Sequence, residues 1–311
     1  MEFMKYPSIE NSYRSKHIER WVSYFPQLLT ERYLLTEKIH GSNFSVMIDE
    51  DTVEFAKKSA KLGITEKFFD YQNTVKKYDN EFLLAQEYIK ANDEISTIRL
   101  FAEIFGGGIQ KGVFYGDEKR LRVFDCWLNE ELLPQCELIE LLKTIGIYHM
   151  FVPFIAIVDS LEEALSYNTV FNSKLHDSDD NICEGLVIKP YDKVFKYGDG
   201  SIFYIKNKNK EFSEKKSAPK VNFVPSEQLE SAQHEYSLYL TKNRLDGIMS
   251  KHGEIDTDSQ MGEYIKYMTT DAREDYLKDN MEQFLELEDK ERGKLFSISG
   301  KVIVPMLREY L

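Results

Sequence analysis

Apolar and polar residues alternate between residues 32 and 58 in the manner of β-strands. The segments RYLLTEK, SNFSVMI and TVEFAKK alternate in part, and the turn-like DED separates the last two. IRLFAEIF at 98–105 and LRVFDCW at 121–127 are further predicted strands, and three consecutive glycines end the first of them. EGLVIKP at 184–190 and SIFYIKNK at 201–208 are the last two. We therefore expect the N-terminal part of the chain to be built on sheets.

Helical spacing of apolar residues appears in shorter stretches and then takes over. Residues 64–93 predict a helix with a break, 130–144 and 160–167 predict amphipathic helices, and the polar, acidic stretch 172–181 predicts a loop. After Pro225, helical spacing is expected within 229–240, 243–250, 260–268, 271–288 and 300–309. The pattern predicts an α+β protein, with antiparallel sheets and helices in residues 1–222 and a small all-helical domain in residues 223–311.

Composition places the chain among ordinary globular proteins. Its 311 residues suggest about two domains, and 42% hydrophobic and 30% charged residues are usual values. There is no apolar run long enough for a membrane span, and the N-terminus lacks the apolar stretch of a signal peptide. The three cysteines, Cys126, Cys136 and Cys183, fit no zinc motif. We expect a soluble protein with reduced thiols in a cytoplasmic type of compartment.

The net charge of −13 taken alone argues against a nucleic-acid partner. A basic groove can nevertheless lie on an acidic body. Residues 206–220 hold six lysines among few apolar residues, and they are the candidate for such a groove.

The segment Glu37-Lys38-Ile39-His40-Gly41 lies between two predicted strands, so alternation would point Lys38 and His40 to one face. Gly41 would let the backbone pass closely by a bound group. A lysine is a nucleophile only as the free amine, whose reference pKa of about 10.4 falls with burial and with neighbouring cations. An isolated strand lysine is more often a solvated surface charge. The cations that the sequence offers are Lys57, Lys58, Lys189, Lys206 and Lys208.

Five motifs follow one another in a fixed order: KIHG at 38–41, FAEIFGGGIQKGVFYG at 101–116, LRVFD at 121–125, EGLVIKP at 184–190 and IKNK at 205–208. This order resembles the covalent nucleotidyltransferase superfamily of DNA ligases, RNA ligases and mRNA capping enzymes. K-x-H-G together with IKNKNKEFSEKK resembles the RNA ligase 2 family in particular. YPSIENSY near the start and TKNRLDGIMSKHGEI at 241–255 are similar to the two ends of that family.

The resemblance implies a nucleotidyltransferase (ATP-grasp-like ligase) domain followed by a helical domain that engages RNA. It implies an ATP-dependent RNA ligase that joins 3′-hydroxyl and 5′-phosphate ends through a lysyl-AMP and an RNA-adenylate. We expect ATP and Mg²⁺ or Mn²⁺ as cofactors. We expect RNA ends in nicked duplex RNA or an RNA–DNA hybrid as the partner, no membrane, and a monomer.

The resemblance also implies residue roles. Lys38 is the nucleophile, with His40 and Asp125 as further catalytic residues, and Glu184 holds the metal. Glu103 contacts the ribose and Phe124 stacks on adenine. Lys58 stands where the family usually carries Arg, whose fork a lysine does not reproduce. The remaining residues that line the nucleotide or its phosphates are Glu37, Ile39, Asn43, Lys189, Lys206 and Lys208.

Some alternatives stay open. His40 and Phe124 have a second reading as core residues, and Glu184 as a surface carboxylate. A DNA ligase or a capping-type enzyme is a rival, although these usually carry Asp in place of His40 and end in an OB-fold barrel rather than in helices. A non-catalytic RNA-binding relative is the second rival, but it would be expected to lose Lys38, Glu184 or Lys206.

Overall fold

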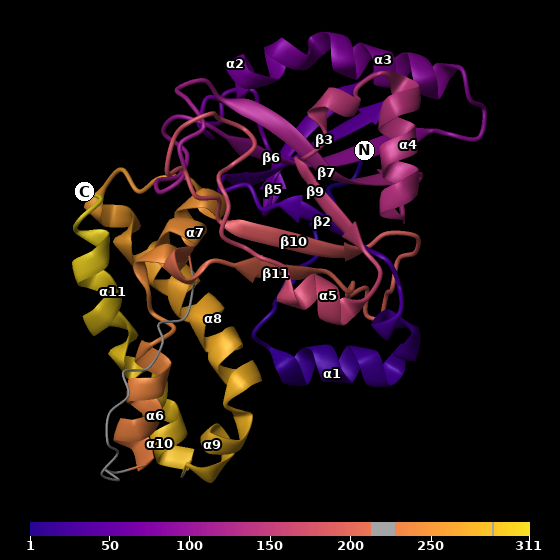
Figure 1. Ribbon diagram of the computed structural model, residues 1–311. Helices are drawn as coiled ribbons and strands as arrows, with labels where there is room; N and C mark the ends of the chain where they lie inside the picture. Colours follow the sequence, from indigo (N-terminus) through magenta and orange to yellow (C-terminus); the bar gives the residue numbers. More distant parts are fainter. Residues whose placement is uncertain (213–227, 288) are drawn as a thin grey trace. The chain divides into compact units, whose positions relative to one another are not determined.

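The computed structural model describes residues 1–212, 228–287 and 289–311, which form two compact units, Met1–Glu211 and Phe212–Leu311 (Figure 1). The domain boundary predicted at residues 222 and 223 lies outside the described residues. In the described ranges, no helix is both long and apolar enough to cross a bilayer.

A six-stranded antiparallel sheet has the order β5-β4-β3-β6-β7-β8. The apolar residues Phe44, Leu100 and Val123 are fully buried on one of its faces, where Phe44 contacts Tyr71 of α2 (Tyr71–Val75). α3 (Asp79–Lys90) covers the same face, as Figure 1 shows. The strands are β3 (Ser42–Asp49), β4 (Val53–Lys57), β5 (Ala60–Lys61), β6 (Thr97–Phe105), β7 (Arg120–Leu128) and β8 (Glu131–Leu132).

A five-stranded sheet has the order β1-β11-β10-β2-β9, in which only β1 and β11 pair in parallel. Leu35, Ile188 and Ile205 pack on one face against α1 (Ser15–Tyr24) and α5 (Leu161–Ser166), which lie beneath β10 and β11 in Figure 1. The strands are β1 (Glu10–Asn11), β2 (Tyr33–Glu37), β9 (Phe154–Val158), β10 (Gly185–Pro190) and β11 (Ile205–Lys208).

The opposite face of this sheet carries lysines. Lys206 lies across from Val187 and Lys208 from Gly185, and Lys189 is two residues beyond Val187 on β10. Because paired residues and every second residue share a face, Lys189, Lys206 and Lys208 point to the same side. The predicted common face of Lys206 and Lys208 is confirmed.

Each predicted strand is present, although the one expected at 201–208 begins only at Ile205, and some helix predictions need correction. Residues 64–70 are not helical, because Phe69 and Asp70 adopt left-handed backbone angles just before α2. α4 (Gln135–Ile145) begins later than predicted, since β8 occupies part of the expected range. α1, β1 and β9 were not predicted. Short 3₁₀ turns span Pro26–Leu29, Lys76–Tyr78, Tyr148–Met150, Lys210–Phe212, Asp258–Gln260 and Phe296–Ile298.

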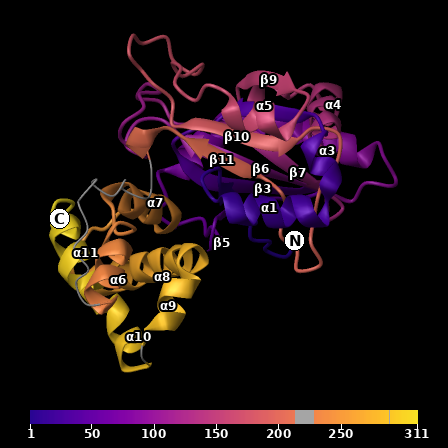
Figure 2. The ribbon, with the colours of Figure 1, turned by 60° about the horizontal axis from the view of Figure 1, so that its bottom comes forward.

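The described residues of the C-terminal unit form helices only, as predicted (Figure 2). Its core contains the buried residues Tyr236, Leu245, Met268, Tyr276 and Ile303. The prediction of separate helices at 260–268 and 271–288 is wrong, because α8 runs without a break from Met261 to Asp279 and α9 follows it. The helices are α6 (Gln228–Ser237), α7 (Lys242–His252), α8 (Met261–Asp279), α9 (Met281–Glu286), α10 (Asp289–Leu295) and α11 (Ser299–Leu307).

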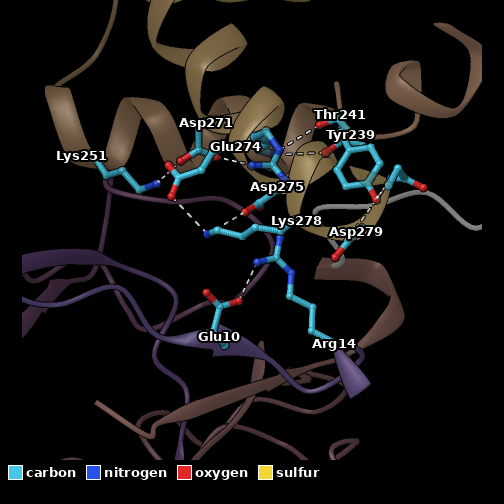
Figure 3. A network of polar contacts seen from close by, with 12 residues as sticks. Glu10, Arg14, Tyr239, Thr241, Lys251, Asp271, Glu274, Asp275, Lys278 and Asp279 are labelled. Carbon is cyan, nitrogen blue, oxygen red and sulfur yellow. Dashed lines mark hydrogen bonds and ion pairs between the residues drawn. The ribbon is translucent and has the colours of Figure 1, made fainter. Parts of the chain in front are cut away.

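A buried arginine joins α7 to α8 within this unit. Arg244 is 2% exposed and forms ion pairs with Asp271 and, at 2.9 Å, with Asp275, while its Nε donates to the Tyr239 carbonyl at 2.9 Å. Lys251 binds the second carboxylate oxygen of Asp271 at 3.1 Å (Figure 3). A buried charge is tolerated only when it is paired and hydrogen-bonded, so this network ties the two helices together.

Candidate active site

Three cationic or potentially cationic side chains converge on the carboxylate of Glu184. Lys38 Nζ lies 2.9 Å and His40 Nδ1 3.1 Å from Oε2, and Lys208 Nζ lies 2.9 Å from Oε1. Glu184 is 2% exposed. The predicted common side of Lys38 and His40 is confirmed, because both side chains reach one oxygen atom.

The backbone explains why these residues meet. β2 ends at Glu37 and β10 begins at Gly185, and the Lys38 N–H donates to the Gly185 carbonyl at 2.9 Å. Gly185 has φ +142°, and a Cβ there would lie 2.2 Å from the Asn207 carbonyl oxygen. Only glycine permits this approach of β10 to β11, which brings Lys208 to Glu184.

The charge of Glu184 is fixed by its neighbours. Burial by itself would raise the pKa of the Glu184 carboxyl, but Lys208, Lys38 and His40 outweigh burial and hold this pKa well below its ordinary value. The carboxylate is therefore ionised at neutral pH. Such a group orients cations well and accepts protons poorly.

A second carboxylate lies beside this cluster. Glu103 of β6 is paired across the sheet with Asn43 of β3. Burial raises the pKa of the Glu103 carboxyl to about 7, and the charge of Glu184 adds to the rise, while Lys38 and Lys58 oppose it. Lys58 is thus among the charges that act on the Glu103 carboxyl.

Gly41 lies close to β6. A Cβ on Gly41 would lie 2.4 Å from the Ile104 carbonyl oxygen and 2.9 Å from Glu103 Cγ. The approach to β6 is therefore sufficient by itself to require glycine here. The expectation that Gly41 also lets the backbone pass close to a bound group stays a prediction.

Phe124 lies at an irregularity of β7. Phe101 pairs with Asp125 and Ala102 with Val123, so Phe124 has no residue directly opposite it on β6. Its half-buried ring contacts Tyr6 at a centroid distance of 5.1 Å, and Lys189 Nζ lies 5.2 Å from the ring centroid.

Asp125 and Lys189 form a buried pair next to this ring. Lys189 Nζ lies 2.8 Å from Asp125 and donates to the Phe124 carbonyl at 2.6 Å. Asp125 also accepts from the Tyr6 hydroxyl and, at 2.7 Å, from Gln135. Burial lowers the pKa of Lys189, and Asp125 opposes that shift. Because Lys189 and Asp125 belong to different sheets, the pair also shows that the two sheets face each other here.

The other predicted site residues are distributed as follows. Glu37 is buried and accepts from Ser173 Oγ at 2.6 Å and from the Lys174 N–H at 2.7 Å, and burial raises the pKa of its carboxyl. Ile39 is buried, and Lys206 shares its face with Lys208. Lys57 pairs with Glu66 at 2.7 Å instead of joining the cluster around Lys38.

Sequence reasoning missed several residues that hold this site. Tyr6 and Gln135 bind Asp125, Ser173 binds Glu37, and Tyr115 accepts from the His40 N–H at 2.8 Å. Most of them lie in loops or in the N-terminal segment, where periodicity gives no signal. Only the similarity of YPSIENSY and FAEIFGGGIQKGVFYG to a family hinted at two of them.

Carboxylates that suit a metal ion are few. In the described part of the chain, no group of three or more His, Cys, Asp or Glu side chains gathers in the way a protein metal cage requires. Glu103 and Glu184 are close enough for the charge of one to raise the pKa of the other. A divalent cation would relieve this repulsion, and magnesium usually takes one or two protein carboxylates and keeps its waters.

Comparisons with known proteins agree with this architecture. The family model described as RNA ligase matches residues 31–208, and the model described as T4 RNA ligase 2 C-terminal matches residues 222–297.

Solved structures of an RNA ligase from Naegleria gruberi have a similar fold. A substituted form with ATP and Mn has a TM-score of 0.50 and 16% identity, covering 68% of this chain and 57% of that chain. The form with PPi has a TM-score of 0.48 and 17% identity over 68% and 57% of the two chains. This chain thus matches a little over half the length of those structures. Because the RNA ligase model covers more than half of the present chain, this protein belongs to the RNA ligase family and is a member of its RNA ligase 2 group.

Proposed function

We propose that this protein is an ATP-dependent RNA ligase in which Lys38 carries the adenylyl group. The observation that supports the proposal most is the convergence of Lys38, His40 and Lys208 on the buried, ionised carboxylate of Glu184. A lysine amine oriented in this way, beside further lysines of β11, suits attack on a phosphate of ATP.

Glu184 holds the protonated Lys38 amine by an ion pair and accepts an N–H from it once it is neutral, and the low pKa of Glu184 makes it unsuited to take a proton. In the first step the Lys38 amine, having released one proton to water, attacks the α-phosphorus of ATP. An N–P bond forms, the bond to the pyrophosphate oxygen breaks, pyrophosphate leaves, and the nitrogen releases its second proton to water. In the second step the 5′-phosphate of RNA takes AMP from Lys38, and in the third the 3′-hydroxyl attacks that phosphate and releases AMP.

Each step transfers a phosphoryl-type group, so the protein contributes mainly position and opposite charge. Lys206 and Lys208 lie on one face of β11, and we assign them to the phosphates of the nucleotide. We also assign Lys58 to the phosphates, and His40 to the leaving pyrophosphate.

The half-buried ring of Phe124 is the surface on which we place adenine, with Glu103 on the ribose and Glu37, Ile39 and Asn43 lining the nucleotide. Asp125 and Lys189 are buried next to Phe124 and occupied by one another. We therefore assign them to positioning Phe124, rather than to the chemical step or to the phosphates.

Mg²⁺ or Mn²⁺ fits the Glu184 carboxylate, which is ionised and offers hard oxygen ligands, and magnesium needs only one or two protein carboxylates. When bound, the ion supplies positive charge that offsets the charge on the phosphates.

The substrate that we propose is a 3′-hydroxyl and 5′-phosphate pair in nicked duplex RNA or an RNA–DNA hybrid. We propose residues 1–222 as the adenylyltransferase domain and the helical residues 223–311 as the RNA-engaging domain. We also propose that the protein works as a monomer in a reducing compartment.

The test is sealing of a nick by the purified protein with ATP and magnesium. Matched nicked RNA–RNA, RNA–DNA and DNA–DNA duplexes, each with a labelled 5′-phosphate, give the substrate class, and GTP in place of ATP gives the nucleotide. We expect sealing at the RNA nicks with ATP, and none by Lys38→Ala. Sealing confined to DNA–DNA nicks, or sealing that survives Lys38→Ala, would contradict the proposal.

A further inference from the structure

We infer that Tyr115 is a positioning residue for the nucleophile Lys38, acting through the backbone of His40. The inference rests on the proposed function, because it concerns the rate at which Lys38 takes up AMP. Its structural basis is a pair of loops, the one that carries Tyr115 and the one at 172–181, which hold the chain on both sides of Lys38.

Tyr115 contacts the segment of the nucleophile directly. Its phenol oxygen accepts a hydrogen bond from the His40 N–H at 2.8 Å, and the residue is 4% exposed. Its ring packs edge-on against Phe105 at a centroid distance of 5.1 Å. Residues 38–41 are irregular backbone rather than strand, so this hydrogen bond replaces one that a sheet would have supplied.

The loop that carries Tyr115 is fixed to the loop at 172–181. Phe114 N–H donates to Asn181 Oδ1 at 2.8 Å, and Asn181 Nδ2 donates to the Phe114 carbonyl at 2.7 Å. Arg120 Nη2 donates to the Tyr115 carbonyl at 2.6 Å and to the Leu175 carbonyl at 3.2 Å. These bonds on both sides of Tyr115 leave its phenol little freedom to move.

The loop at 172–181 also holds Glu37, the residue before the nucleophile Lys38. Glu37 accepts from Ser173 Oγ at 2.6 Å and from the Lys174 N–H at 2.7 Å. Lys38 therefore lies between two anchors, the Glu37 carboxylate on one side and the His40 N–H on the other. Both anchors attach to the same pair of loops, so together they determine where the Lys38 amine and the His40 ring lie relative to Glu184.

The phenol suits this role because it stays neutral. Burial raises the pKa of Tyr115, the His40 N–H opposes the shift, and the charges of Glu37, Glu184 and Glu103 add to it. Tyr115 therefore adds no charge to the cluster around Lys38, and its contribution is the hydrogen bond and the packing of the ring.

The test compares Tyr115→Phe with Tyr78→Phe. Tyr78 is a matched control, because its hydroxyl also accepts a backbone N–H, that of Leu121 at 2.9 Å, and it is buried on the helix-covered side of the six-stranded sheet. Both changes remove a buried hydrogen bond to a backbone N–H and keep the ring, and Tyr78→Phe also removes the hydrogen bond between Tyr78 and the Arg122 side chain. Three quantities are measured for each variant: the single-turnover rate of lysine adenylylation at saturating ATP, the ATP concentration at half-maximal rate, and the rate of sealing a preformed RNA-adenylate.

We expect Tyr115→Phe to slow lysine adenylylation by roughly ten- to a hundredfold, as a small displacement of a reacting group does. The half-saturating ATP concentration should change little, because Tyr115 holds the chain and not the nucleotide. Sealing of the preformed RNA-adenylate should be largely spared, because Lys38 is not the nucleophile in that step. Tyr78→Phe should resemble the unchanged protein in all three measurements.

The inference is overturned if Tyr115→Phe and Tyr78→Phe behave alike, or if Tyr115→Phe slows adenylylation and sealing by the same factor. The ratio of the adenylylation rate to the sealing rate in one preparation does not depend on how much of the variant is folded. This ratio therefore tests the inference even if Tyr115→Phe is less stable. Failure of the unchanged protein to adenylylate Lys38 would instead count against the proposed function.

Discussion

Lys38 and Glu184 are 146 residues apart in the sequence, and their side chains form an ion pair at 2.9 Å. The pair joins the end of β2 to the start of β10, and it lies where His40 and Lys208 reach the same carboxylate. This arrangement makes Glu184 the group on which the orientation of the lysine amine depends.

Glu184→Gln should slow transfer of AMP to the lysine by roughly a hundredfold or more, because the amide keeps the shape but removes the charge that orients three side chains. The measurement is incorporation of labelled AMP in a single turnover. Glu118→Gln is the control, since Glu118 pairs with Lys77 at the surface and such pairs contribute little. A variant that retains the full rate would remove Glu184 from the mechanism.

The raised pKa of Glu103 predicts a pH dependence of stability. With a pKa of about 7 in the folded protein and an ordinary value of 4.5, the folded state holds a proton that the unfolded state has released between these values. The contribution of Glu103 to stability is therefore complete below pH 4.5 and is lost as the pH rises through about 7. This loss lowers the free energy of unfolding by at most about 3 kcal/mol.

Urea unfolding of the protein and of Glu103→Gln across this pH range checks the prediction. Glu37 shifts in the same direction, whereas the depressed pKa of Glu184 acts in the opposite direction in both proteins, so the difference between them is the test. As the pH rises through this range, the free energy of unfolding should fall more, or rise less, in the unchanged protein than in Glu103→Gln. Equal slopes for the two proteins would show that Glu103 does not titrate in this range.

Lys58→Arg should keep or improve sealing, because Arg keeps the positive charge and adds a bidentate fork. The charge at this position already lowers the pKa of Glu103. Sealing rates on one nicked duplex are compared with those of Lys57→Arg, whose lysine pairs with Glu66 and should tolerate the change. A loss of tenfold or more in Lys58→Arg alone, about 1.4 kcal/mol, would contradict the assignment of Lys58 to the phosphates.

Arg244→Met should destabilise the C-terminal unit by about 1–3 kcal/mol, because Asp271 and Asp275 lose a buried charged donor while Asp271 keeps Lys251 and Asp275 keeps Lys278 as a partner. Hydrogen exchange of α7 and α8 in the full chain measures the effect locally. Lys242→Met provides the comparison, since its exposed pair with Glu309 should contribute about 0–1 kcal/mol. Similar exchange in both variants would mean that the Arg244 network contributes little.

The strands and the lysine face were predictable because burial imposes a period of two on a strand. Lys206 and Lys208, separated by one residue, needed only that rule to be placed together. The resemblance assigned Lys38 and Glu184 to one nucleotide site, but their ion pair was not predicted, since no local pattern relates residues so far apart.

The loops that support the site were not predictable. Tyr115 and Ser173 act through single hydrogen bonds in irregular segments, where no period constrains which side chain points inward. Gly41 was recognised as special, but its close neighbour is β6, which sequence could not identify. The gap expected between the helices at 260–268 and 271–288 was also wrong, because α8 continues through Thr269 and Thr270. Threonine has a weak helix propensity, which tertiary packing overrides here.

Mass spectrometry of the pure protein after incubation with ATP and a divalent ion shows whether Lys38 takes up an adenylyl group. We expect the chain to gain the mass of one AMP, the peptide containing Lys38 to carry it, and Lys38→Met to abolish the gain. A protein that remains unmodified, or one whose AMP is attached to another residue, would contradict the assignment of Lys38 as the nucleophile.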